Sequence, residues 1–169
     1  TRAPHRGSVN TLVKRAGTIY GDNTDAYGFE AMVRHLGVDC RGKKALVLGS
    51  GGASVTAQAV LEQLGAAVTV ISRSGPDNYE NLHRHGDAAI LVNATPVGMY
   101  PKAGVSPVDL DRLPQLEAVL DIVYNPTRTR LILDAQARGI PCERGLLLLV
   151  AQAVTASEIF HGQPIPAAT

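Results

Sequence analysis

The chain has 169 residues, enough for one domain of ordinary size, and a formal net charge of +1 from 16 basic and 15 acidic residues. Because the charges are interspersed, the sequence offers no electrostatic footprint for nucleic acid or for an anionic membrane surface, and neither partner is expected. The longest apolar stretch, residues 146–151, is far shorter than the roughly 20 residues that span a bilayer, so a soluble protein is predicted.

The first predicted element is a β-hairpin between residues 8 and 20, because two short β-like runs flank the turn residues 15–17. A helix is expected next. Thr24 or Asp25 can cap its start, and apolar residues at helical spacing continue to Gly37, which ends it.

Four continuous apolar runs follow, at residues 44–50, 66–72, 88–95 and 117–124. Runs without polar alternation are typical of strands that are buried on both faces. A helix between the first two runs is predicted by apolar residues at helical spacing, which are Val55, Ala59, Val60 and Leu64. Strand, helix and strand together predict a βαβ unit.

The rest of the chain predicts a helix at residues 127–139, a short strand at 140–143 and a final helix at 145–162. Regular alternation of strands and helices is typical of a parallel sheet with a helical layer on each side. The predicted fold class is therefore α/β, a Rossmann-like doubly wound parallel sheet with helices on both faces, preceded by the short hairpin and a helix.

The loop at residues 49–54, "GSGGAS", lies where the first buried strand turns into a helix. Gly49 permits the tight turn, Gly51 lets the main chain approach a diphosphate, and the helix N-terminus offers unpaired N–H groups. Ser54 takes the third position of the dinucleotide fingerprint, where Gly or Ala is usual, and is small enough for close packing. The context predicts dinucleotide binding, with an ordinary tight turn as the alternative.

The end of the second strand, Ser72-Arg73-Ser74, indicates which dinucleotide binds. It carries no carboxylate to accept the ribose 2′-hydroxyl of NAD. Arg73 instead offers a permanently charged guanidinium that suits a phosphate, and the serines offer hydroxyls. NADP is therefore favoured over NAD, and a solvated surface arginine is the alternative interpretation.

Several other residues are given plain structural interpretations. Cys40 and Cys142 are far apart and lack metal-binding spacing, which favours a reduced, cytoplasmic setting. His83 and His85 lack a third ligand nearby, so no metal site is predicted. Tyr79 is assigned to packing or to the surface.

Seven separated motifs occur in order between about Ser8 and Gly162: "GSVNTLV", "GDNTDAYGF", "GSGGAS", "SRS", "NATPVGM", "DIVYNPTRTRLILDAQARG" and "GLLLLVAQAV". Together they resemble the shikimate dehydrogenase family, including its quinate-using relatives. The resemblance implies reduction of 3-dehydroshikimate to shikimate with NADPH, in the chorismate pathway to the aromatic amino acids.

The resemblance also assigns roles to individual positions. Those matching substrate contacts in the family are Asn10, Asp25, Tyr124 and Gln152, with Asp25 as the catalytic acid or base. Those matching cofactor contacts are Gly49, Ser50, Gly51, Gly52, Ala53, Ser72, Arg73, Ser74, Ala94, Thr95, Ile122 and Gly145. Departures from the family pattern are Ser50 for alanine, Ala26 and Leu147 for glycine, and Leu148 for methionine; Leu147 adds the most volume near the nicotinamide.

The resemblance implies a division of the chain into three parts. Residues 1–23 are expected to be a remnant of the substrate-binding domain, residues 24–162 the NADP-binding domain with its linking helices, and residues 163–169 a tail. Family members carry a catalytic lysine in an "NVTxPxK"-like segment of the N-terminal substrate domain, and these 169 residues contain no such segment. The missing domain is therefore a predicted partner, and a homodimer is a further one.

Interconversion of an alcohol and a ketone needs a group that moves a proton at the oxygen. Asp25 is the candidate, but an aspartate with an ordinary pKa of about 4 is a poor acid at neutral pH and needs a partner such as lysine. Lys43 and Lys44 are expected at the opposite end of the sheet from the glycine loop, and Lys14 lies along the hairpin. Lys102 lies in a predicted loop and remains a possible acid.

We therefore expect these residues alone to bind NADP(H) and to turn over little or no substrate. One alternative is a non-catalytic NADP-binding or regulatory module, and others are a quinate dehydrogenase or another small-ring dehydrogenase. Three polar positions, Asn10, Asp25 and Gln152, favour the enzyme, because a module without substrate has no evident need for them.

Overall fold

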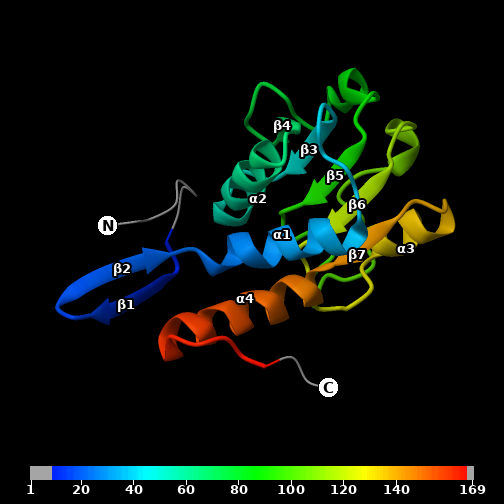
Figure 1. Cartoon of the computed structure of the whole chain (residues 1–169). Coiled ribbons are helices and arrows are strands. Elements are labelled where there is room, and N and C mark those ends of the chain that lie inside the picture. Colours follow the sequence, from blue (N-terminus) through cyan, green and yellow to red (C-terminus); the bar gives the residue numbers. More distant parts are fainter. Residues whose placement is uncertain (1–8, 167–169) are drawn as a thin grey trace.

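The computed structural model describes residues 9–166, and Figure 1 shows a central sheet with a hairpin projecting to one side. The beginning of the predicted N-terminal remnant (1–8) and the end of the predicted tail (167–169) lie outside the described residues. The strands are β1 (Thr11–Arg15), β2 (Thr18–Asp22), β3 (Lys44–Leu48), β4 (Ala67–Ile71), β5 (Ile90–Asn93), β6 (Ala118–Asp121) and β7 (Cys142–Arg144). The helices are α1 (Thr24–Leu36), α2 (Gly52–Gln63), α3 (Arg130–Ala137) and α4 (Gly145–His161), with 3₁₀ segments η1 (Leu82–His85) and η2 (Leu110–Arg112).

The hairpin forms where the sequence predicts it. Strands β1 and β2 are antiparallel, and Lys14 pairs with Ile19 in their register. The turn between them contains Ala16 and Gly17, both with positive φ, which gives a two-residue turn whose twist matches that of the strands.

The N-cap of helix α1 lies one residue before the first of the two predicted caps. The cap is Asn23, whose side-chain oxygen accepts a hydrogen bond from the backbone N–H of Asp25 at 3.1 Å. Thr24 and Asp25, the two predicted caps, are already inside the helix. Gly37 ends the helix in a left-handed conformation, as the sequence predicts.

The five-stranded sheet has the order β4-β3-β5-β6-β7, and every pair in it is parallel. After β3 the chain moves outward to β4 and then returns across β3 to β5. The strand order therefore reverses between β3 and β5, which is where open α/β sheets bind their ligands, outside the carboxyl ends of the strands.

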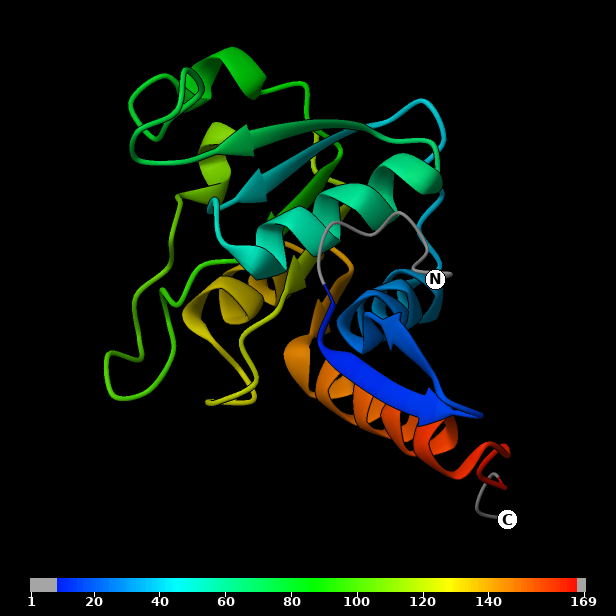
Figure 2. The same cartoon turned by 90° about the vertical axis from the view of Figure 1, so that its left-hand side faces the viewer.

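Helices cover both faces of this sheet, which confirms the predicted fold class (Figure 2). On one face α1, α2 and the start of α4 pack on Ala45 and Val47 of β3. On the other face α3, η1 and η2 pack on Leu46 and Leu48 of the same strand. Because neighbouring residues of β3 point to opposite faces, a strand in the middle of the sheet must be apolar throughout.

Two details differ from the sequence prediction. Strand β4 is an edge strand, and Ile71 is its only buried residue, whereas burial on both faces was expected. In α2 the buried face includes Ser54, Thr56 and Leu61, and Val55, one of the apolar residues at helical spacing, is 41% exposed. The apolar spacing located the helix correctly, and Val60 is buried and Leu64 packs on the core, whereas Val55 faces solvent.

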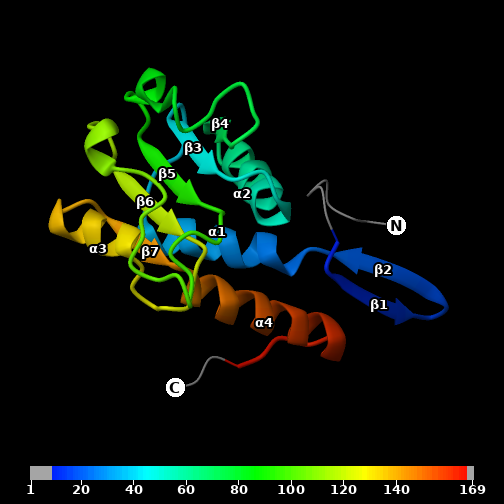
Figure 3. The same ribbon diagram turned by 180° about the vertical axis from the view of Figure 1, so that it is seen from behind.

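Helix α4 extends from the sheet to the hairpin, as Figures 1 and 3 show from opposite sides. Gly28 of α1 faces it so closely that a Cβ would lie 2.6 Å from the backbone oxygen of Leu148. At the far end the guanidinium of Arg15 donates a hydrogen bond to the carbonyl of Ile159. The α1–α4 contact therefore holds α4 against the domain, and the hairpin contacts the C-terminal end of α4.

Candidate functional site

A groove of about 540 Å³ opens at the carboxyl ends of β3, β4 and β5, at the point where the strand order reverses. Its lining residues are Gly49, Ser50, Gly51, Ser72, Arg73, Tyr79, Ala94, Thr95, Pro96, Val97, Ser106 and Pro107. Most of the predicted cofactor residues are therefore in one place. Gly52 and Ser74, also predicted, adjoin lining residues in the chain but do not line the groove.

The glycine loop forms one wall of the groove. Its first residue must be glycine because of its backbone conformation and the packing around it. Gly49 has a φ of +105°, and a Cβ there would lie 2.9 Å from the carbonyl oxygen of Ala94. Ser54 then fixes the loop, because its hydroxyl donates to the carbonyl of Gly49 at 2.6 Å. This third fingerprint position is fully buried, as close helix packing requires.

Packing within the protein does not explain the next two glycines, Gly51 and Gly52. A Cβ at Gly51 or Gly52 would meet no atom of the described protein within 4 Å, and neither residue has a positive φ. Gly51 caps α2 without any side-chain hydrogen bond to the first-turn N–H groups. The loop therefore leaves open space in front of unpaired helix donors, which suits a diphosphate.

Arg73 lies on the rim of the groove, just beyond the end of β4. It is exposed, and no protein carboxylate pairs with it among residues 9–166. Ser72 lies beside it and is buried, with its backbone N–H bonded to the carbonyl of Asp77 at 3.1 Å. The rim therefore presents an exposed guanidinium next to a fixed loop.

Tyr79 is a groove residue that the sequence interpretation missed. Burial raises the pKa of its phenol, and the positive charge of Arg73 acts in the opposite direction. Its ring also packs against the buried cluster on that face of the sheet. An aromatic ring and a guanidinium thus lie in one groove, a combination suited to a purine base and its phosphate.

A second pocket of about 250 Å³ lies where α1, α2 and α4 meet the end of β6. Its lining residues are Asp25, Phe29, Ala53, Thr56, Ile122, Tyr124, Leu148, Leu149 and Gln152. The predicted acid and two of the predicted substrate residues are therefore together. Ala53 and Ile122, predicted cofactor residues, also lie here, so the glycine loop borders both pockets.

Asn10 does not line this pocket, but polar contacts through Thr24 link it to Gln152. Its side-chain oxygen accepts from the backbone N–H of Thr24 at 2.9 Å and from the hydroxyl of Thr24 at 3.2 Å. That hydroxyl lies 3.3 Å from the side-chain oxygen of Gln152. The loop before β1, the start of α1 and helix α4 are thereby joined through polar contacts at the edge of the pocket.

Gly145 lines neither pocket, and the structure explains it by packing. A Cβ there would lie 2.1 Å from the carbonyl oxygen of Ile122 and 2.8 Å from the carbonyl carbon of Val123. The first residue of α4 is therefore pressed against the backbone that follows β6. Its absent side chain lets α4 start against this backbone while Ile122 lines the second pocket.

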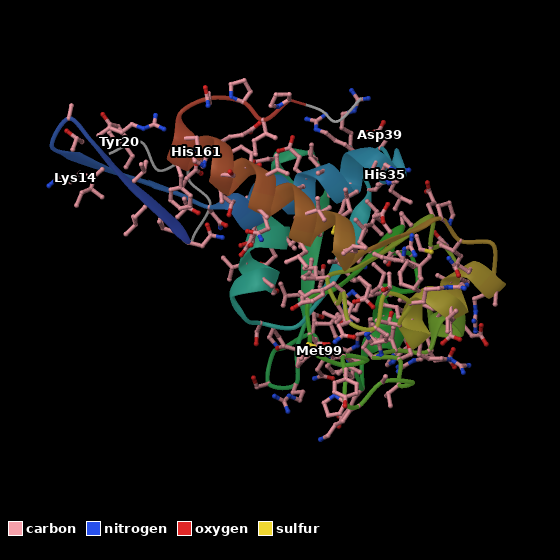
Figure 4. All side chains as sticks on the ribbon, turned by 90° about the horizontal axis from the view of Figure 1, so that it is seen from below. Lys14, Tyr20, His35, Asp39, Met99 and His161 are labelled. Carbon is pink, nitrogen blue, oxygen red and sulfur yellow. The ribbon has the colours of Figure 1, made fainter. Side chains whose placement is uncertain are left out.

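None of the lysines among the described residues lines the pocket that contains Asp25. Lys43 and Lys44, at the amino end of β3, pair with Glu117 and Asp87 and are at the opposite end of the sheet from the glycine loop, as predicted. Figure 4 shows Lys14 on the hairpin, far from Met99 in the loop after β5. Lys102 contributes to an apolar hollow beside the groove, together with Met99.

Residues 9–166 contain no cluster of three side chains able to hold a metal ion. The ring of His85, one half of the H-x-H pair, lies 2.9 Å from the carboxylate of Asp77. Over the same residues, no helix combines the length and apolar character needed to cross a bilayer.

The chain is similar to known proteins over most of its length. No family model matches it. It is 34% identical to a shikimate dehydrogenase (NADP(+)) of Clostridium perfringens, in an alignment that covers 96% of this chain and 65% of that protein. The chain therefore spans slightly less than two thirds of the length of this curated relative.

Solved structures resemble it over a similar extent. The shikimate 5-dehydrogenase of Thermus thermophilus, in complex with NADP(H) and shikimate, superposes with a TM-score of 0.81 at 32% identity, covering 95% of this chain and 64% of that one. The 5-ketofructose reductase of a Gluconobacter strain superposes with a TM-score of 0.80 at 30% identity, covering 95% and 65%.

Proposed function

The chain belongs to the shikimate dehydrogenase family, and on this premise we propose that it is the cofactor-binding part of an NADP-dependent shikimate dehydrogenase. The reaction would be the reduction of 3-dehydroshikimate to shikimate in the pathway to the aromatic amino acids. One observation carries the proposal: the glycine loop at 49–54 lines both the groove, through Gly49 to Gly51, and the pocket that contains Asp25, through Ala53.

The groove fits NADP by the chemistry of its residues. Gly51 and Gly52 leave room for a diphosphate at the N-terminus of α2, and Arg73 provides an exposed cation for the 2′-phosphate, with Ser72 and Ser74 beside it. When bound, the cofactor would supply a hydride for the reduction. This assignment explains why a Cβ at either glycine would have no packing partner within the described protein.

The second pocket would hold the reacting carbonyl. Ile122 and Leu148 give it apolar walls that exclude water, while Tyr124 and Gln152 offer groups suited to the hydroxyls of a ring. Asp25, in the first turn of α1, would hold or move the proton at the substrate oxygen. It is the only carboxylate among the described residues that line this pocket.

We further propose that these residues do not complete the reaction alone. Within the described part of the chain no lysine lines the pocket of Asp25, and the hairpin exposes Leu12, Ile19 and Tyr20 to solvent. A two-stranded hairpin with apolar exposed faces is marginal by itself and suits contact with another unit. The proposed division is a hairpin remnant of the substrate domain at 1–23, the NADP-binding domain at 24–162 and a tail at 163–169.

The proposal predicts that these 169 residues bind NADPH but reduce 3-dehydroshikimate at a negligible rate. Calorimetry measures the binding, and loss of NADPH absorbance measures the turnover. Turnover near that of a complete family member would contradict the proposed inactivity. Failure to bind NADPH would instead contradict the cofactor assignment and would favour a scaffold that has lost its ligand.

A second prediction concerns Gly51. Replacement by alanine should leave the free energy of unfolding within about 0.5 kcal/mol, because the added methyl meets no protein atom. It should lower NADPH affinity roughly tenfold, because the methyl fills space assigned to the diphosphate. Urea denaturation and calorimetry on the same sample separate the two effects, and an unchanged affinity would argue against a diphosphate at this loop.

The substrate itself has a second candidate. A 5-ketofructose reductase shares the architecture at 30% identity, so a polyhydroxylated open-chain or ring ketone would fit the same polar lining. A non-catalytic NADP-binding module is the third candidate. Supplying the substrate domain of a family member in trans, with each ketone in turn, separates these candidates. Turnover selects the substrate, and binding without any turnover favours the module.

A further inference from the structure

Asp121, the last residue of β6, carries a carboxylate that is completely buried. No charged side chain of the described residues compensates it: its pKa is raised by burial, and the only opposing influences are hydrogen bonds from Thr129, Val123 and Asn93. A buried ionisable group without an opposite charge is costly, and an apolar residue often serves stability as well or better. Its presence at the end of a central strand therefore needs an explanation.

The contacts of this carboxylate explain why it is an aspartate. The hydroxyl of Thr129 donates to one oxygen at 2.5 Å. The other oxygen accepts from the backbone N–H of Val123 at 3.1 Å and from the side-chain amide of Asn93 at 2.9 Å. All three partners donate, and only an ionised carboxylate is purely an acceptor.

Asn93, at the end of β5, extends this network into the wall of the groove. Its side chain is also fully buried, and its oxygen accepts from the backbone N–H of Thr95 at 3.1 Å and from the Thr95 hydroxyl at 2.7 Å. Its amide also donates to the carbonyl of Val97 at 3.2 Å. The contact with Asp121 fixes which way this amide points, and so which of its atoms face the loop.

Each of the two loops held in this way lines one of the two pockets. Thr95 and Val97 line the groove, and the methyl of Thr95 lies 3.0 Å from the position that a Cβ of Gly49 would take. On the other side, Val123 stands between Ile122 and Tyr124, which line the second pocket. A single buried carboxylate thus connects the wall of one pocket with the wall of the other.

We propose that Asp121 is the positioning residue of the dinucleotide site, holding the loops at 94–97 and 122–124 in the arrangement that binds the cofactor. This inference rests on the proposed function. Asp121 lines neither pocket and acts through Asn93 on one loop and through Val123 on the other. Thr129, the cap of α3, completes the arrangement by holding the second carboxylate oxygen.

Asp121→Asn tests the inference with little change in shape. The new amide must direct its N–H groups either toward the Thr129 hydroxyl, which would then have to accept instead of donate, or toward the N–H groups of Val123 and Asn93, so the loops should loosen. We expect NADPH affinity to fall about tenfold, and the amides of Thr95, Val97 and Val123 to lose protection from hydrogen exchange by a similar factor. Both measurements are made on the whole chain, at a temperature where each variant is folded.

Glu143→Gln is the matched control. Glu143 is the other buried carboxylate next to β6, but it bonds with His35 and with the backbone of Arg144, away from both pockets. Glu143→Gln should leave NADPH affinity within about twofold of the unmodified chain, even if the substitution lowers stability. An equal loss of affinity in both variants would mean that Asp121 acts through stability alone, and the inference would be wrong.

Thr129 provides a second, independent pair of variants, which decides the matter if Asp121→Asn does not fold. Thr129→Val removes the hydroxyl that Asp121 accepts from and should weaken NADPH binding, whereas Thr129→Ser keeps the hydroxyl and should restore it. Binding that neither Asp121→Asn nor Thr129→Val changes would overturn the inference alone. An unmodified chain that does not bind NADPH would overturn the proposed function, and the inference with it.

Discussion

Replacing Arg73 by alanine is expected to weaken NADPH binding by roughly 10- to 100-fold while NADH binding changes by about twofold or less. The reason is that the two cofactors differ only in the 2′-phosphate, and Arg73 is the exposed cation at the rim of the groove. A charge-assisted contact with a phosphate is among the stronger polar interactions available to a protein. Calorimetric titration of both cofactors gives the two affinities.

Arg84→Ala is the control for the loss of one positive charge. Arg84 is exposed on η1, follows β4 in the same region of the chain and does not line the groove. It should change neither affinity by more than about twofold in physiological salt, where a distant exposed charge is largely screened. Equal losses for NADPH and NADH in Arg73→Ala would reject the phosphate assignment.

Gly145→Ala is expected to lower the free energy of unfolding by about 3 kcal/mol, and to weaken NADPH binding as well. The added methyl would lie 2.1 Å from the carbonyl oxygen of Ile122, which is backbone and has no rotamer to yield. Either α4 moves away from α1, or the segment after β6 shifts and carries Ile122 out of the second pocket. Urea denaturation measures the loss of stability.

The control for Gly145→Ala is Gly52→Ala. Both glycines are the first residue of a helix at the carboxyl edge of the sheet, but a Cβ at Gly52 meets nothing within 4 Å. Gly52→Ala should leave stability unchanged or slightly raise it, because alanine favours helix. Equal effects of the two substitutions on unfolding would contradict the steric explanation for Gly145.

The order of the elements could be predicted because each carries a local signal, such as the continuous apolar runs and the glycine at position 37. What failed depends on neighbours that are distant in the chain. Asn23, Thr24 and Asp25 are all of residue types that favour the N-cap position, and only the backbone conformation selects Asn23 as the cap. The exposure of β4 follows from its place at the edge of the sheet, which no local pattern of apolar residues reveals.

The residues of the candidate site likewise divide into those that a local sequence signal reveals and those that only the fold reveals. The glycine loop and Arg73 could be predicted because their spacing along a βαβ unit is itself the signal. Tyr79 was missed because it reaches the groove from an irregular segment between β4 and η1. Asp121 belongs to a motif that the sequence reveals, but its role depends on Asn93 and Thr129, and only folding brings these residues together.

The strand order has a consequence for how the molecule holds together. Strands β3 and β4 come from residues 44–71 and strands β5 to β7 from residues 90–144, so the sheet is two sequence-contiguous halves that meet along the single seam between β3 and β5. Both pockets take residues from each half. A dinucleotide seated there would act as a reversible cross-link, and cohesion of the halves would rise with its concentration.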